Sequence, residues 1–277
     1  MAENNPGDIL TCDWNPFVGC ERFSPGCAHC WFLDGIYPWQ QRLGNIPAGQ
    51  RADAPYFVER RMAAEALAGK NGIVGVCQHG DLSWDAVSDA QIHAVLDIVD
   101  TVAPDKIAQR QRAGRPAPKY LLWTKRVARM RRIMLERYDN QAFAHRVPAW
   151  YGLGASVENQ TWVDRRLADL LAIEGFRIAV LEPILGPVDL SAFIDRLDWV
   201  VVGSETGDGC RRANADWFRG IRDVTKAAGK PLFIKQLGTS HTSPERELDG
   251  RTWDEFPAGF VKRVKGVKAA RQGRARV

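Results

Sequence analysis

The sequence predicts an α/β fold in which strands and helices alternate to form a partial or complete (β/α) barrel. Two patterns indicate this fold: short apolar runs recur along the chain, and helical patterns lie between them. The length of 277 residues is also typical of such barrels. A doubly wound open sheet is the alternative, and in both folds ligands bind beyond the carboxyl ends of the strands.

Six short runs of β-branched and aromatic residues are the expected strands. None of them alternates strictly between apolar and polar residues, which is typical of parallel strands that are buried on both faces. The runs are residues 72–77, 120–124, 150–156, 177–181, 199–203 and 231–235.

Helices are expected between these strands. Ser88 can cap a helix whose apolar residues recur at steps of three and four. Asn159 can cap the next one in the same way. A third helix is expected over residues 215–228, because Gly229 and Pro231 follow it and stop it.

The positive charge is concentrated at one end of the chain. Residues 261–277 carry seven Lys or Arg and no acid, whereas the net charge of the whole chain is +5. Such a tail can attract phosphates in a salt-sensitive way, so nucleic acid is a candidate partner, and a solvated terminus is the alternative. We divide the chain into an N-terminal arm (1–12), a barrel domain (13–240), a C-terminal extension (241–260) and this basic tail.

The composition points to a cytoplasmic protein. No apolar run reaches the roughly 18–20 residues that a membrane span needs, so no membrane partner is expected. Residues 1–7 lack the basic and then apolar start of a signal peptide. In the cytoplasm, the six cysteines are expected to be ligands or core residues rather than disulfides.

A cysteine-rich segment is the strongest chemical signal. Residues 14–31 read WNPFVGCERFSPGCAHCW, which places Cys20, Cys27 and Cys30 at the spacing C-x6-C-x2-C. Glycines and prolines between the cysteines let such a segment wrap around a metal centre. Three thiolates without an obvious fourth suit a 4Fe–4S cluster with one open iron.

Zinc is the alternative that the spacing leaves open. A structural zinc site prefers four ligands, and Cys12, eight residues before Cys20, can complete a four-cysteine set. A site of three cysteines and one histidine can use His29 or His79. A segment without any metal is the third interpretation.

Polar residues follow the expected strands where each strand ends. Because the carboxyl ends of parallel strands meet at one edge of a sheet, we expect these side chains to line a common mouth. Acids, amides and bases in one mouth are suited to a zwitterion such as an amino acid or S-adenosylmethionine. The residues are His79, Asp81, Lys125, Arg126, Glu158, Glu182, Glu205 and Lys235. No GxSxG, Walker-type or GxGxxG sequence supports a hydrolase, P-loop or Rossmann protein.

An ordered set of motifs resembles a known family. After the cysteine segment come LLWTKR, GASVENQTWVDRRL, LEPILGPVDL, DWVVVGSETGDGCRRANADWFRGIRD and FIKQLG. Together they look like the phage and bacterial three-Cys-motif family of uncharacterised proteins, which is similar to the radical S-adenosylmethionine enzymes. The resemblance covers about residues 13–238. The cysteine spacing is three residues longer than the C-x3-C-x2-C that is usual in that superfamily.

The resemblance implies a barrel of the radical S-adenosylmethionine type, with Cys20, Cys27 and Cys30 as ligands of a 4Fe–4S cluster. Such a cluster binds S-adenosylmethionine and cleaves it to give an adenosyl radical. The family pattern has no cysteine at the position of Cys12, which disfavours the four-cysteine zinc site.

The resemblance also adds candidate cofactor-binding residues. His29 occupies a place where radical enzymes often carry an aromatic residue against the adenine of the cofactor, and Asp81 lies in a segment that matches the family loosely. By their position at strand ends, the glutamates are candidates for binding the ammonium or the ribose hydroxyls of the cofactor. The lysines and Arg126 are candidates for binding its carboxylate. The full candidate set is His29, Asp81, Lys125, Glu158, Glu182, Glu205 and Lys235.

The function predicted in this way is that of a radical S-adenosylmethionine enzyme. Its expected partner is an electron donor such as flavodoxin or ferredoxin, and its expected substrate is nucleic acid or a modified nucleotide. A small metabolite or peptide is the alternative substrate. A zinc- or cluster-stabilised binding module that acts with a partner protein is the alternative without catalysis.

Overall fold

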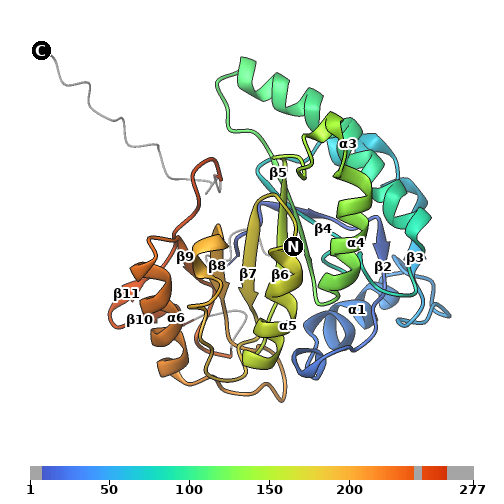
Figure 1. Cartoon of the computed structure of the whole chain (residues 1–277). Coiled ribbons are helices and arrows are strands. Elements are labelled where there is room, and N and C mark those ends of the chain that lie inside the picture. The colour runs from blue at the N-terminus through green and yellow to red at the C-terminus, as the bar shows by residue number, and fades with distance from the viewer. Residues whose placement is uncertain (1–7, 240–244, 261–277) are drawn as a thin grey trace, which may run out of the picture.

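The fold is built on a seven-stranded parallel sheet that curls into a half-barrel (Figure 1). The computed structural model describes residues 8–239 and 245–260. The strands of this sheet are β1 (Cys12–Trp14), β4 (Ile73–Val76), β5 (Lys119–Thr124), β6 (Tyr151–Ser156), β7 (Arg177–Leu181), β8 (Trp199–Val202) and β9 (Leu232–Ile234). They lie in that same order across the sheet. The order never reverses, as it would at the switch point of a doubly wound sheet, so the sheet is a partial barrel.

All six strands predicted from the apolar runs are present as β4 to β9. The apolar runs do not predict β1, whose three residues CDW pair in parallel with β4, Cys12 opposite Val74. So short a strand has no periodic pattern of its own, and only its pairing with β4 defines it.

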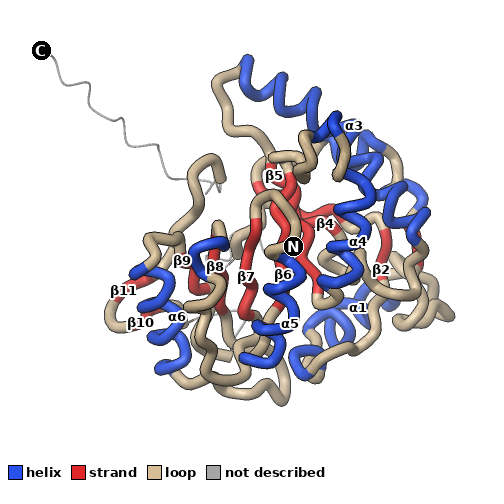
Figure 2. The backbone as a smooth tube through the Cα atoms, viewed as in Figure 1, coloured by secondary structure: helices blue, strands red, loops and turns tan. Residues whose placement is uncertain are grey.

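Helices cover the outer face of the sheet (Figure 2). The α-helices are α1 (Tyr37–Arg42), α2 (Ala64–Ala68), α3 (Asp89–Arg112), α4 (Val127–Tyr138), α5 (Gln160–Leu170) and α6 (Ala215–Ala227), and a π-helix spans Trp31–Ile36. The predicted caps of α3 and α5 are confirmed. Ser88 forms a capping box with Gln91, and the side chain of Asn159 accepts a hydrogen bond from the backbone N–H of Trp162.

Short elements complete the fold. Two antiparallel pairs join β2 (Phe17–Val18) to β3 (Tyr56–Phe57) and β10 (Glu247–Leu248) to β11 (Arg251–Thr252). Single turns of 3-10 helix span Pro25–Cys27, Glu59–Arg61, Gln141–Phe143 and Ile194–Arg196.

The inner face of the sheet is apolar at the amino ends of the strands and charged beyond their carboxyl ends. Leu121, Ile178, Trp199 and Phe233 are buried on this face and form a core separate from the one beneath the helices. Each contributes roughly 1.5–3 kcal/mol of hydrophobic stabilisation. Strand side chains alternate between the two faces of a sheet. When this alternation is followed past the ends of β5 to β9, inner-facing positions hold charged residues. These are Lys125, Glu158, Glu182, Glu205 and Lys235.

Both ends of the described chain pack on this inner core. Ile9, from the segment expected as an N-terminal arm, and Phe260, from the expected extension, are buried there. The basic tail lies outside the described residues. Within the parts of the chain that the structure covers, no helix combines the length and the apolar character of a membrane span.

Candidate functional site

The three cysteines of the sequence motif lie on one loop, residues 19–30, which we call the cysteine loop. It begins beside the end of β4, where the backbone N–H of Gly19 donates to His79 O at 3.1 Å. The next residue, Cys20, donates its backbone N–H to Ala52 O at 2.8 Å. From there the loop contacts residues that follow β5, β6 and β8, so it lies at the carboxyl edge of the sheet.

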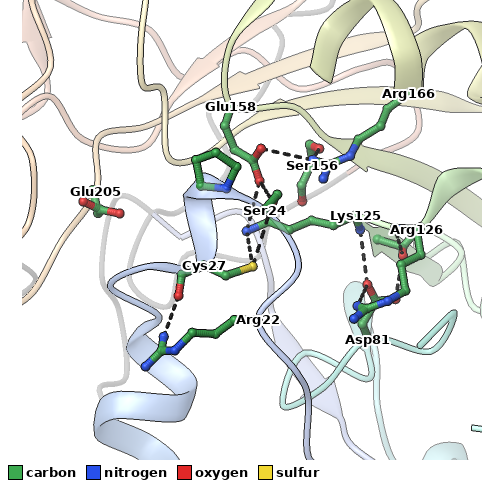
Figure 3. Close-up of polar contacts among 12 residues, drawn as sticks. Arg22, Ser24, Cys27, Asp81, Lys125, Arg126, Ser156, Glu158, Arg166 and Glu205 are labelled. Carbon is green, nitrogen blue, oxygen red and sulfur yellow. Dashed lines mark hydrogen bonds and ion pairs between the residues drawn. The ribbon is translucent and has the colours of Figure 1, made fainter. Parts of the chain in front are cut away.

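Glu158, which follows β6, anchors the centre of this loop (Figure 3). Its side chain is 0% exposed, and its Oε1 accepts a hydrogen bond of 2.5 Å from Ser24 Oγ. Two cations flank the carboxylate: Lys125 Nζ lies 3.3 Å from Oε1 and Arg166 Nη1 lies 3.2 Å from Oε2. A buried carboxylate needs such partners, and here they also hold the loop on the sheet.

Lys125, which follows β5, joins this carboxylate to a cysteine. Its Nζ lies 3.3 Å from Cys27 Sγ, within hydrogen-bond distance of the sulfur. Burial opposes the charge of Lys125, but the negative charges of Cys27 and Glu158 outweigh that effect and raise its pKa. Burial likewise would raise the pKa of Cys27, but Lys125 and the backbone N–H groups of Phe23 and Ser24 outweigh burial and lower it. The environment therefore favours an ammonium beside a thiolate.

A second anchor comes from beyond β8. The guanidinium of Arg211 donates two hydrogen bonds to the buried Glu205, from Nε to Oε2 at 2.8 Å and from Nη2 to Oε1 at 2.5 Å, and its backbone N–H donates a third to Oε2 at 2.9 Å. The same Nη2 donates to Pro25 O of the cysteine loop at 2.8 Å. Burial would raise the pKa of Glu205, but Arg211 outweighs burial and lowers it, with a smaller contribution from His29. His29 lies over this region, since a Cβ atom at Gly209 would be 3.3 Å from its Cε1.

The loop also has an internal brace. Arg22 donates from Nη1 to the carbonyl oxygens of Cys27, at 2.6 Å, and Ala28, at 3.2 Å. Its Nη2 donates to Asp34 Oδ1 at 2.5 Å. These bonds fix the backbone between the second and third cysteines against the following helix.

The three thiols share one electrostatic neighbourhood. Burial and the Asp81 carboxylate raise the pKa of Cys20 to about 12, and negative charge on Cys27 and Cys30 adds to the effect. Burial also raises the pKa of Cys30 and outweighs the backbone N–H groups of Leu33 and Phe32, which lower it. In the part of the chain that the structure describes, no group of three or more His, Cys, Asp or Glu side chains is arranged to hold a single metal ion.

Cys12 lies away from the other three cysteines. It begins β1, and its Sγ donates to Asn71 O, ahead of β4, at 3.7 Å. This is the amino edge of the parallel sheet, whereas Cys27 contacts Lys125 beyond the carboxyl end of β5. The structure therefore does not bring Cys12 to Cys20 in the way that a four-cysteine zinc site requires.

The candidate Asp81 is surrounded by groups of the chain itself. One oxygen accepts hydrogen bonds from Thr124 Oγ1 at 2.5 Å and from the backbone N–H of Ser83 at 3.0 Å. The other accepts from the backbone N–H of Lys125 at 3.2 Å and from Arg126 Nη1 at 3.3 Å. Asp81 is thus placed to tie the segments that follow β4 and β5.

Glu182 and Lys235 form the more open pair of the candidate set. Lys235 Nζ lies 2.7 Å from Glu182 Oε2, and Gln236 Nε2 donates to Oε1 at 3.0 Å. Their side chains remain 25% and 19% exposed, respectively. Burial opposes the charge of Lys235, but Glu182 outweighs burial and raises its pKa. Gly203 permits this packing, because a Cβ atom there would lie 2.9 Å from Gln236 Nε2.

Two residues beside the candidate site were not predicted from the sequence. Arg166 of α5 is buried, donates to Ser156 O and stacks with its guanidinium carbon 3.9 Å from the ring centre of Trp162. Phe23 of the cysteine loop lies 4.5 Å from the guanidinium carbon of Arg126 and 5.9 Å from the Trp162 ring. The available signals were an arginine on the apolar stripe of α5 and an aromatic residue within a polar loop.

Comparison with protein families gives a match over most of the chain. The model of a family described as "Protein of unknown function (DUF5131)" matches residues 9–257. This match runs from before β1 to beyond β11 and so includes the whole sheet and the cysteine loop. No curated protein and no solved structure matches the chain.

Proposed function

The chain belongs to the DUF5131 family, and we propose that it is a radical S-adenosylmethionine enzyme with a 4Fe–4S cluster on Cys20, Cys27 and Cys30. The observation that carries this proposal is the position of the cysteine loop across the carboxyl edge of a curled parallel sheet. Ligands of barrel folds bind at this edge. The resemblance of the ordered motifs to radical enzymes points the same way.

The chemistry of the donor set supports a cluster rather than a single metal ion. Three free thiols lie on one loop in one electrostatic neighbourhood, and Lys125 beside Cys27 offsets the negative charge that thiolate ligands carry. Cys12, the fourth donor of an all-cysteine zinc site, lies at the other edge of the sheet. A 4Fe–4S cluster with one open iron supplies a binding point for the amino and carboxylate groups of S-adenosylmethionine and the electron that cleaves its C–S bond.

The residues of the chain divide into two roles in this proposal. Glu182 and Lys235 are partly exposed and carry opposite charges 2.7 Å apart, so they suit the ammonium and the carboxylate or ribose of a zwitterionic cofactor. Asp81, Glu158 and Glu205 are buried and already paired with cations, so they position the cysteine loop and the strand ends. His29 lies near Glu205, and by the family resemblance it is our candidate for contact with the adenine of the cofactor.

The electron has to come from a partner, for which a flavodoxin or ferredoxin is our candidate. Nucleic acid or a modified nucleotide is the proposed substrate, on the strength of the basic residues 261–277, which lie outside the described structure. The proposal of radical chemistry rests on the cysteine loop and does not depend on this choice of substrate.

Anaerobic reconstitution with iron and sulfide tests the proposal. We expect a brown protein with broad visible absorbance that dithionite bleaches and that cleaves S-adenosylmethionine. Cys27→Ala should lose the iron, whereas the matched variant Cys12→Ala should retain it, because Cys12 is away from the loop. Stoichiometric zinc without iron uptake would contradict the proposal and favour a zinc-stabilised binding module.

A further inference from the structure

Lys125 distinguishes one of the three cysteines from the other two. Its ammonium lies 3.3 Å from Cys27 Sγ, and no other lysine or arginine of the described chain makes a hydrogen bond to a cysteine sulfur. Cys20 Sγ donates instead to the neighbouring carbonyl oxygen of Glu21, at 3.5 Å. Among the three thiols of the described loop, Cys27 is therefore the one with a cation hydrogen-bonded to its sulfur, whereas Arg126 acts on Cys20 and Lys125 on Cys30 through charge alone.

The ammonium is held in this position from two sides. The backbone N–H of Lys125 donates to Asp81 Oδ2, which fixes the start of its side chain at the end of β5. At the far end, Glu158 Oε1 lies 3.3 Å from Nζ (Figure 3). Glu158 is fully buried and is itself fixed by Ser24 and Arg166. A lysine restrained in this way loses little additional freedom when it donates to the sulfur.

We propose that Lys125 is a positioning residue that sets the reduction potential of the cluster through Cys27. This inference rests on the proposed function, because it requires the cluster. Reduction adds one negative charge to a cluster that thiolates already make negative. A nearby cation and an N–H···S hydrogen bond stabilise the reduced state more than the oxidised state, and burial strengthens both effects. Lys125 therefore makes the cluster easier to reduce.

Three variants isolate the charge of Lys125. Lys125→Met removes the charge but keeps an unbranched side chain, and Lys125→Arg keeps the charge. The matched control is Lys119→Met, since Lys119 begins the same strand but donates to Ala149 O, at 2.7 Å, near the opposite edge. For each protein we would measure iron and sulfide per chain, and then the midpoint potential in a redox titration followed by electron paramagnetic resonance, without S-adenosylmethionine.

The expected result is a shift to a more negative potential in Lys125→Met, with a smaller shift in Lys125→Arg and none in Lys119→Met. If Lys125→Met and the unmodified protein have equal midpoint potentials, the inference is overturned, while the proposed function of the protein stands. Failure of the unmodified protein to take up iron overturns the proposed function itself, so the two failures are distinguishable.

A second variant keeps the inference testable if Lys125→Met does not retain its cluster. Glu158→Gln removes the carboxylate that partly neutralises Lys125 and preserves the shape of the side chain. The potential should then shift in the opposite direction, to a more positive value. An unchanged or more negative potential in Glu158→Gln contradicts the role assigned to Lys125.

Discussion

Gly26 lies directly against the side chain of Glu158. A Cβ atom at position 26 would come within 2.5 Å of Glu158 Cγ and within 2.7 Å of its Oε1. Since Glu158 is held by Ser24 and two cations, it has little room to move away. The backbone of the cysteine loop can therefore pack this closely against Glu158 only with a glycine at position 26.

Replacement of Gly26 by alanine should lift the loop from the sheet. We expect a loss of about 1–3 kcal/mol of stability, typical of overpacking, together with weaker iron retention after reconstitution. Urea unfolding and iron analysis measure the two effects. Gly35→Ala is the matched control from the following helix, because nothing lies within 4 Å of a Cβ atom there. Equal behaviour of the two variants would contradict the steric role of Gly26.

Removal of the Glu158 carboxylate should destabilise the protein strongly. Glu158→Ala leaves the ammonium of Lys125 and the guanidinium of Arg166 without their common buried partner. A broken buried ion pair costs about 3–5 kcal/mol, and we expect a loss in this range in urea unfolding. Ser24→Ala removes only one neutral hydrogen-bond donor, so we expect it to lower the free energy of unfolding by about 1 kcal/mol or less. A similar loss in both variants would show that the carboxylate is not the centre of this network.

The pair of Glu205 and Arg211 should make stability depend on pH in the acid range. The pKa of Glu205 is lower in the folded protein than in an ordinary glutamate. Its contribution is therefore complete above the ordinary value of about 4.3 and is lost as the pH falls through the lowered folded value. Glu205→Gln should lower the melting temperature clearly at pH 7 and by progressively less below about pH 4.

Thermal unfolding at pH 7, 5 and 3.5 tests this pH dependence. The control is Glu136→Gln, which removes an exposed carboxylate paired with Arg132 on α4 and should change the melting temperature little at any pH. A difference between the Glu205 variant and the unmodified protein that stays constant with pH would rule out the charge as its cause.

Loss of the Glu182 charge should weaken cofactor binding without affecting the cluster. A hydrogen bond to a charged group contributes about 1.5–3 kcal/mol, so Glu182→Gln should bind S-adenosylmethionine roughly 10- to 100-fold more weakly. Equilibrium binding to the reconstituted protein measures the affinity, and iron content checks the cluster. Asp216→Asn, an exposed position on α6, is the control. Unchanged affinity in Glu182→Gln removes this residue from the cofactor site.

The sheet could be predicted from the sequence because its central strands are buried on both faces. Uninterrupted apolar runs such as Trp199–Val202 result from that burial. β1 could not be predicted, since its three residues include Asp13 and form a strand only through pairing with β4. The end of α3 could not be predicted either, because the helix continues to Arg112, past Pro104 and past the apolar residues that indicated its start.

The candidate site could be predicted as a set of residues but not as a set of roles. The strand-end rule identified Lys125, Glu158 and Glu205, because it depends only on where strands stop. It could not show that Glu158 faces Ser24 of the cysteine loop, since that contact joins residues 134 positions apart. Nor could it separate the buried carboxylates from Glu182, because burial on the inner face depends on which loop covers each strand end.

The distances in sequence between the loop and its anchors govern when the site can form during synthesis. Ser24 precedes Glu158 by 134 residues, and Pro25 precedes Arg211 by 186. At about 5–20 residues per second, the ribosome completes the second anchor roughly 10 to 40 seconds after the loop itself. Throughout that interval the thiols belong to a nascent chain that cannot yet close over them. If the proposed cluster is present, its insertion is therefore a late event, because a chain stalled before β8 lacks Arg211 and offers only part of the site.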